Sequence, residues 1–330
     1  MKLLPFVALC IFGILGCSGT NQGKQEALPI KIGFLVKSGT EVWFRQEWKF
    51  AEEASKTLGF DLVELATPDA GTVMSAIDNL HTQGAQGLII CSPDVKLGPA
   101  IVEKAKQFNM KLLTVDDRLV GPDGQPLKDV AYLGISAENI GKMVGQAIVD
   151  EIKQRGWNMN EVGALATTVD ELETARQRTD GAKSVLLANG FPEKNIFETP
   201  WKNRDIKGAL DVAAVTLTQH PEIKKWVAYS MNDDGVLGTV RACEGRGIPA
   251  SDVIGVGING TSGVDDFRKS GPTGFFASVL LSPRRHGYGT AEMMFNWIKN
   301  GVVPPLETFT DGILITRENY KEQMHKEGLL

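Results

Sequence analysis

Apolar, strand-like runs alternate with segments of helical periodicity along most of this 330-residue chain. A short apolar run at 30–36 is followed by a helical pattern at 43–58, and further runs follow at 61–66, 87–91 and 111–115. Strands that alternate with helices form parallel sheets, because each helix returns the chain across the face of the sheet. The pattern restarts after a run at 131–135, so we predict an α/β protein with two doubly wound parallel-sheet halves.

The second half repeats the alternation with its own strands and helices. Strands are predicted at 162–167, 196–199, 226–230, 253–258, 274–280 and 312–315, and helices at 137–155, 171–189, 205–219, 234–246 and from Ser282-Pro283 to 300. Asp69 is a candidate N-cap for a helix to about residue 82, a further helix is expected at 96–107, and Thr316 is the expected cap of a C-terminal helix.

Composition excludes several classes of function. The formal net charge is −5, whereas nucleic-acid-binding domains usually present a basic face. Only four cysteines and four scattered histidines are present, without a paired ligand spacing, so neither a disulfide scaffold nor a metal site is expected. Cys91 and Cys243 lie in a strand-like and a helix-like segment, and we expect both to be buried thiols. No cofactor is predicted.

The N-terminus has the pattern of an export signal. Lys2 precedes an apolar run at 3–15 that is too short to span a bilayer, and Gly16 and Cys17 follow it. Residues 14–17, Ile-Leu-Gly-Cys, resemble the bacterial lipobox, which implies cleavage after residue 16 and lipidation of Cys17. The alternative is a plain secretory signal with an incidental cysteine. Residues 18–28 are polar and read as a flexible tether.

Polar and aromatic side chains follow the predicted strands. In doubly wound sheets, ligands bind beyond the carboxyl ends of the strands. The residues found there are Lys37, Glu41, Trp43, Phe44, Asp116, Asp117, Glu171, Leu172, Arg176, Arg178, Met231, Asn232, Asp233, Asp234 and Asn259. Donors beside acceptors suit a polyhydroxyl ligand, and an aromatic ring suits the apolar face of a sugar. The strand ends therefore indicate a sugar site.

Each member of this set also has a structural interpretation. Lys37 and Glu41 fit a solvated surface pair, and Asp116-Asp117 fits a turn. Glu171, Arg176 and Arg178 fit an exposed helix face, while Asn232 and Asn259 fit caps or turns. Trp43 and Phe44 are adjacent, so we expect one of the two rings in the core rather than both on one helix stripe. The set as a whole is more persuasive than any single member.

Competing catalytic motifs are weak. Residues 255–260 match GxGxxG, but no acidic residue lies about 20 positions further on, so a dinucleotide site is disfavoured. No GxxxxGK[ST] or GxSxG motif occurs. Asp116 and Asp117 could pair as acid and base, but neighbours on an extended strand point to opposite sides. We therefore predict that the protein is not an enzyme.

Several segments resemble the bacterial periplasmic L-arabinose-binding proteins. They are residues 31–37, 43–44, 47–50, 115–117, 171–172, 174–176, 231–232, 255–260 and 286–288, and the resemblance extends over almost all of 29–330. It implies a type I periplasmic binding protein, with two α/β domains joined by three hinge crossings that close on one monosaccharide. It also implies a monomer that delivers sugar to the permease of an ABC importer, here from the periplasm or cell envelope and through a lipid anchor.

The same resemblance implies domain limits and site residues. One domain would comprise 29–135 with 282–310 and the other 136–281 with 311–330. The implied sugar contacts are Lys37, Glu41, Trp43, Phe44, Asp117, Arg178, Asn232 and Asn259, lined further by Asp116, Ile135, Leu172 and Met231. Crossings would fall near Ile135-Ser136, Leu281-Ser282 and Thr310-Asp311.

The chain departs from the family pattern at Ile135, Leu281 and Ser262, where the family has Met, Pro and Asp. Two of these positions lie at crossings near the variable substituent of the sugar. L-arabinose is therefore expected first, with D-galactose and D-fucose as alternatives. A sensor that presents its closed form to a membrane receptor would have the same site. A repressor of this fold would need a basic headpiece, and the export signal argues against one.

Overall fold

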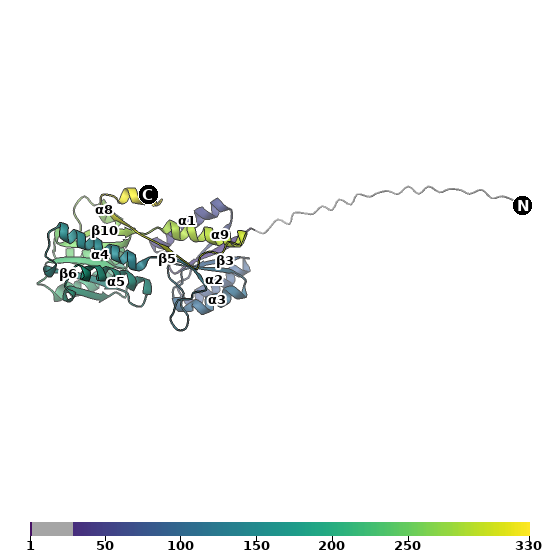
Figure 1. Ribbon diagram of the computed structural model, residues 1–330, viewed down its shortest axis with the longest axis horizontal. Helices are drawn as coiled ribbons and strands as arrows, with labels where there is room; N and C mark the ends of the chain where they lie inside the picture. The colour runs from purple at the N-terminus through teal and green to yellow at the C-terminus, as the bar shows by residue number, and fades with distance from the viewer. Residues whose placement is uncertain (2–28) are drawn as a thin grey trace.

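Two separate six-stranded sheets form the framework of the protein (Figure 1). The computed structural model describes Met1 and residues 29–330. The predicted signal peptide, tether and lipidated Cys17 lie outside these described residues. Each sheet has helices against it, as the doubly wound pattern predicts, and chain segments pass between the two lobes, as the family resemblance implies (Figure 1).

The first sheet has the strand order β11-β5-β4-β3-β1-β2, and its paired strands are all parallel. Its strands are β1 (Lys31–Val36), β2 (Asp61–Ala66), β3 (Gly87–Ile90), β4 (Lys111–Val115), β5 (Ala131–Ile135) and β11 (Glu307–Thr310). The helices of this lobe are α1 (Val42–Leu58), α2 (Ala70–Thr82), α3 (Gly98–Gln107) and α9 (Thr290–Asn300). Asp69 caps α2 in a reciprocal capping box with Thr72, as predicted.

The second sheet has the order β12-β10-β9-β8-β6-β7. Its strands are β6 (Val162–Thr168), β7 (Ile196–Pro200), β8 (Lys225–Ser230), β9 (Val253–Asn259), β10 (Phe275–Leu280) and β12 (Ile313–Thr316). Its helices are α4 (Ala137–Gln154), α5 (Glu173–Ala188), α6 (Ile206–Gln219), α7 (Asp233–Gly245), α8 (Val264–Arg268) and α10 (Tyr320–Lys326). The interior strands are buried on both faces, as parallel strands between helix layers must be.

The chain crosses between the sheets at three places. β5 leads into α4, β10 leads into the helix that continues as α9, and β11 leads into β12. The first two follow the predicted breaks after residues 135 and 281. The third joins strands in different sheets over only a few residues, so the lobes lie close together at the crossings (Figure 1).

Several local predictions were wrong at the C-terminal end of the chain. β11 was not predicted, because its four residues alternate in burial and follow two prolines. β12 pairs with β10 in the antiparallel direction, not in a purely parallel sheet. Thr316 does not cap the last helix, because it still pairs with Ala277; Asn319 is the N-cap of α10 instead.

The two described cysteines lie in the apolar cores of the two lobes. Cys91 and Cys243 are free and buried, as predicted. The core of the first lobe includes Phe34 and Ile89 on its strands, and that of the second lobe includes Trp226 and Phe275. Within residues 29–330, no helix is both long enough and apolar enough to cross a membrane.

Candidate functional site

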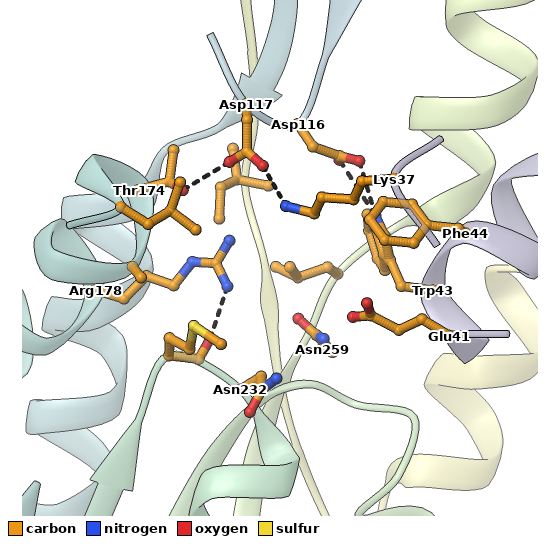
Figure 2. Close-up of a pocket in the computed structure, with 15 residues that line it drawn as sticks. Lys37, Glu41, Trp43, Phe44, Asp116, Asp117, Thr174, Arg178, Asn232 and Asn259 are labelled. Carbon is orange, nitrogen blue, oxygen red and sulfur yellow. Dashed lines mark hydrogen bonds and ion pairs between the residues drawn. The ribbon is translucent and has the colours of Figure 1, made fainter. Parts of the chain in front are cut away.

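One cavity gathers all twelve side chains that the family resemblance implies for the ligand site (Figure 2). It is lined by Lys37, Glu41, Trp43, Phe44, Asp116, Asp117, Ile135, Leu172, Thr174, Ala175, Arg178, Met231, Asn232, Asn259 and Leu281. Residues from both lobes contribute. Most of them follow the carboxyl ends of strands β1, β4, β6, β8 and β9, where parallel sheets place their ligand sites.

Asp117 lies at the centre of the polar contacts. The Lys37 Nζ atom is 2.5 Å from one carboxylate oxygen of Asp117, and the Thr174 hydroxyl donates to the other at 3.0 Å. Burial alone would lower the pKa of Lys37, but the carboxylate of Asp117 raises it, so the ammonium group stays charged. Lys37 is thus paired with Asp117 and is not half of a solvated pair with Glu41.

Asp116 shows why adjacent aspartates can face one cavity. The expectation that they point to opposite sides was wrong, because β4 ends at Val115 and Asp116 adopts a φ of 62°. That left-handed conformation breaks the alternation of an extended strand. Both oxygens of Asp116 accept from the Trp43 indole N–H at 3.2 Å, and one lies 2.7 Å from His286 Nδ1.

Arg178 reaches the cavity from α5 in the second lobe. Its Nη1 atom donates to the Met231 carbonyl at 2.7 Å, while its buried Nε has no partner among the described residues (Figure 2). Burial lowers the pKa of Arg178, although Asp117 and Asp116 oppose the change. A guanidinium with donors to spare, facing a cavity, is suited to a ligand oxygen.

Two asparagines line the opposite wall of the cavity. The Asn232 side-chain oxygen caps α7 by accepting from the Gly235 N–H at 3.1 Å, so its capping role and its place in the cavity are both real. Asn259 ends β9 with a φ of 101°. The next loop is fixed by Asp233, which accepts from the Thr261 and Gly263 N–H groups at 2.9 and 3.1 Å.

The aromatic rings lie on the side of the first lobe. Trp43 and Phe44 lie in the first turn of α1, and both are buried and both line the cavity, so the expected core ring is present and the second ring is buried as well. Consecutive helical residues differ by about 100° in direction, and the cavity extends around the end of the helix. Glu41, the N-cap of α1, lies beside them; burial raises the pKa of its carboxyl group, although Lys37 opposes this.

Other strand-end residues lie outside this cavity. Glu171 and Arg176 are exposed, and Glu171 pairs with Arg204 at 2.6 Å, as their surface interpretation predicts. Sequence reasoning did not assign Thr174, Ala175 and Leu281 to the cavity. Thr174 and Ala175 belong to one of the segments that carry the resemblance, and Leu281 adjoins a predicted crossing, so the signal for them was present.

The chemistry of the cavity is that of a binding site for a neutral polar molecule. Ammonium, guanidinium and amide donors stand beside carboxylate and amide acceptors, and two aromatic rings, four aliphatic side chains and one methionine contribute to the walls. Two lobes with such a cavity between them are the arrangement of the type I periplasmic binding protein fold. The sequence profile described as "Periplasmic binding proteins and sugar binding domain of LacI family" matches residues 30–323, and the chain belongs to this family.

Curated relatives define the nearer relationship. The chain is 48% identical over 316 residues to the L-arabinose-binding periplasmic protein of Escherichia coli K12, with 96% of both chains covered. It is 50% identical over 323 residues to the ABC transporter L-arabinose-binding periplasmic protein of Azospirillum brasilense, covering 98% of this chain and 96% of the relative. These relatives are binding proteins rather than enzymes.

Solved structures share the fold. A periplasmic solute-binding protein of an ABC transporter from Actinobacillus succinogenes 130z, solved with bound D-allose, superposes with a TM-score of 0.76. The two chains are 20% identical, and the match covers 89% of this chain and 99% of the other. At this identity the likeness shows the two-lobed fold alone.

Proposed function

We propose that this protein is the extracytoplasmic substrate-binding component of an ABC sugar importer, and that it binds one monosaccharide between its two lobes. The observation that carries the proposal is the single cavity that collects all the predicted contacts from both lobes. L-arabinose is the favoured ligand because two relatives of about half identical sequence are named for it. D-galactose and D-fucose, which share much of its hydroxyl pattern, are the alternatives.

The polar residues would hold the sugar by its hydroxyl groups. Lys37 and Arg178 would donate, Glu41 and Asp117 would accept, and the amides of Asn232 and Asn259 can do both. Trp43 and Phe44 would flank the ring and cover its apolar faces. Buried charged partners make strong hydrogen bonds, and they leave unpaired groups when a ligand lacks a hydroxyl.

The two lobes would move as domains comprising 29–135 with 282–310 and 136–281 with 311–330. Sugar that contacts both domains favours the closed arrangement and shifts the population toward it. The closed face would then dock on the permease. We propose that the protein is a monomer, because each chain supplies a whole cavity by itself.

We further propose that Cys17 carries a lipid anchor that holds the protein at the membrane of the cell envelope. Mass spectrometry of the N-terminal peptide from the native membrane fraction tests this. A diacylated Cys17 is expected, and Cys17→Ala should release the protein into the soluble extracytoplasmic fraction. An unmodified N-terminus cleaved elsewhere would instead identify a plain secretory signal.

Calorimetry tests the binding function. The chain from Ser18 onward would be unfolded and refolded to remove retained sugar, then titrated with L-arabinose, D-galactose, D-fucose, D-xylose and D-ribose. Tight binding of L-arabinose or D-galactose with little binding of D-ribose is expected. If none of the sugars binds, the assignment of this cavity to a monosaccharide is wrong.

A further inference from the structure

Two segments that carry the family resemblance, around Glu47 and His286, contribute nothing to the cavity wall and yet meet directly behind it. Glu47 lies on α1 and is fully buried, and neither of its carboxylate oxygens has a hydrogen-bond partner among the described residues. His286 is also fully buried, and its Nδ1 atom lies 3.6 Å from a Glu47 oxygen. An unpartnered buried carboxyl group is costly, so it requires an explanation.

A π-helical turn and a close backbone contact bring these two residues together. His286 lies in η5 (Arg285–Gly289), a π-helical turn within the helix that leads to α9. Such turns are rare and often mark functional positions. Gly287 packs on α1, where an added Cβ atom would lie 2.1 Å from the Glu47 carbonyl oxygen. Only glycine permits this approach, which places the imidazole ring against Glu47 and Asp116.

Hydrogen bonds fix where the protons of this cluster lie. The Thr310 hydroxyl donates to the Gly134 carbonyl at 3.3 Å, so it accepts from His286 Nε2 at 3.0 Å. His286 Nδ1 faces Asp116 at 2.7 Å, and a nitrogen facing a carboxylate needs a proton between them. One carboxylate oxygen of Glu47, one carboxylate oxygen of Asp116 and a ring nitrogen of His286 all lie within 4.8 Å of one another. Two ionised carboxylates this close in the core would repel each other.

The electrostatic surroundings separate the two carboxyl groups. Burial and the neighbouring Asp116 raise the pKa of Glu47 well above its usual range, with Lys37 opposing. Burial would also raise the pKa of Asp116, but His286, Lys37 and Trp43 outweigh it and lower that pKa. Glu47 is therefore the neutral acid and Asp116 the anion, and the Glu47 O–H can donate to Asp116.

We propose that Glu47 and His286 are positioning residues of the binding site, which hold Asp116, and through it the Trp43 indole, with Glu47 acting as a neutral hydrogen-bond donor. Trp43 donates to both oxygens of Asp116, so any shift of that carboxylate moves the ring in the cavity wall. His286 also connects to the crossings, because Thr310 ends β11 and Gly134 lies near the end of β5. This inference rests on the proposed function for its affinity measurements.

Several titratable groups face the cluster besides His286, whose Nδ1 atom lies between the carboxyl groups of Asp116 and Glu47. Lys37, after β1, has a raised pKa and stays charged, and Asp117, after β4, pairs with it. Cys91, after β3, and Tyr132, on β5, have raised pKa values and stay neutral, and burial also raises the pKa of Glu41 at the start of α1, with Lys37 opposing. Ionisation of Glu47 would set it against Asp116, so affinity should fall as pH rises.

The experiment compares Glu47→Gln with wild type by sugar calorimetry across neutral and alkaline pH. The Glu47→Gln amide keeps a donor at every pH, whereas Glu47→Leu keeps none, so Glu47→Gln should bind L-arabinose at least about tenfold more tightly than Glu47→Leu and should lose the alkaline decline of wild type. His286→Leu removes the donor to Asp116 and should weaken binding by more than about tenfold, while His286→Asn restores part of the loss. Glu52→Gln on the exposed side of α1 and His81→Leu on α2 are the matched controls and should behave as wild type.

Infrared spectroscopy of the sugar-free protein tests the neutral acid independently of any ligand. In an Asp233→Asn background, which removes the other buried carboxyl group with a pKa near neutrality, the protein should show the carbonyl band of a protonated carboxylic acid at neutral pH, and adding Glu47→Gln should remove that band. Absence of that band, an alkaline decline that persists in Glu47→Gln, or one tightly held divalent metal ion per purified chain would overturn the proposal. If no sugar binds wild type, the proposed function fails, while the infrared result still decides the state of Glu47.

Discussion

The Thr174 hydroxyl donates to Asp117 at 3.0 Å and so joins the two lobes beside the cavity (Figure 2). Asp117 follows β4 in the first sheet, and Thr174 lies in the first turn of α5 beside the second sheet. A charged acceptor makes this a strong hydrogen bond. It lies beside the Lys37 contact, so a residue that binds sugar in our proposal also stabilises the closed arrangement.

We expect Thr174→Val to weaken sugar binding by about tenfold, because valine keeps the shape but cannot donate to Asp117. Thr174→Ser keeps the hydroxyl and is the matched control, with affinity close to wild type. Calorimetric titration with L-arabinose measures both. Equal affinities for the valine and serine variants would show that this bond does not contribute to closure.

Arg178→Ala and Asp117→Ala should each lower affinity by more than about tenfold, since each leaves buried polar partners unpaired. Arg176→Ala is the control, because Arg176 lies on the same helix but is exposed and outside the cavity. The three variants would be compared in one titration series. Wild-type affinity in both cavity variants would refute the site assignment.

Asp233 should make stability depend on pH. Burial raises its pKa from 3.8 to about 7, against the opposing hydrogen bonds from Ser278, Gly263 and Thr261. A carboxyl group with a raised pKa in the folded state contributes stability that is complete below its unfolded pKa and lost as pH rises through its folded pKa. The loss is at most about 1.4 kcal/mol per pH unit in that window.

Denaturant unfolding of Asp233→Asn and wild type between pH 4 and pH 8 checks this expectation. The stability of the variant relative to wild type should rise with pH across that window, because the amide has no charge to bury. Asp265→Asn, at an exposed aspartate of the same lobe, serves as the control. A constant difference at every pH would mean that Asp233 is ionised throughout.

Leu281→Ala should change which sugar is preferred. Leu281 and Ile135 are aliphatic walls of the cavity at two of the crossings. Removing the leucine side chain weakens contacts to L-arabinose and makes room for the additional hydroxymethyl group of D-galactose. The ratio of the two affinities should shift toward D-galactose by about tenfold, in line with the value of a few buried methylene groups.

Titration of Leu281→Ala with both sugars gives that ratio directly. Ile135→Ala tests the second wall in the same way, and Val215→Ala, an exposed residue of α6, is the control. If both wall variants weaken the two sugars equally, Leu281 and Ile135 do not face the substituent that distinguishes them.

Much of the fold was predictable because its periodicity is local. Alternation of apolar strands with amphipathic helices gave the two halves and nearly every strand, as at β4 and β8. β11 escaped detection because it pairs with β5, more than 170 residues earlier along the chain, and its own four residues carry a weak pattern. The direction of β12 likewise depends on its partner β10 and not on its own residues.

Many of the residues that line the cavity were predictable for a similar reason, but their individual backbone conformations were not. The rule that ligands bind at strand ends selected Lys37, Asp117 and Arg178, although it also selected Glu171 and Arg176, which are exposed. Nothing in the sequence shows that Asp116 turns back through a left-handed conformation. Sequence reasoning therefore placed Asp116 and Asp117 on opposite sides, and the structure places them on the same cavity.

The sequence by itself determined the α/β class, the restart into two halves and the polar and aromatic residues at the strand ends, because these features are set by side-chain pattern and neighbouring residues. Only the tertiary structure decided which of those residues meet. Glu47 and His286 stand 239 positions apart in the sequence, and they come together because Gly287 lets a π-helical turn pack on α1. Contacts of that kind depend on how whole elements pack, and burial behind the cavity then sets the charge of the groups involved.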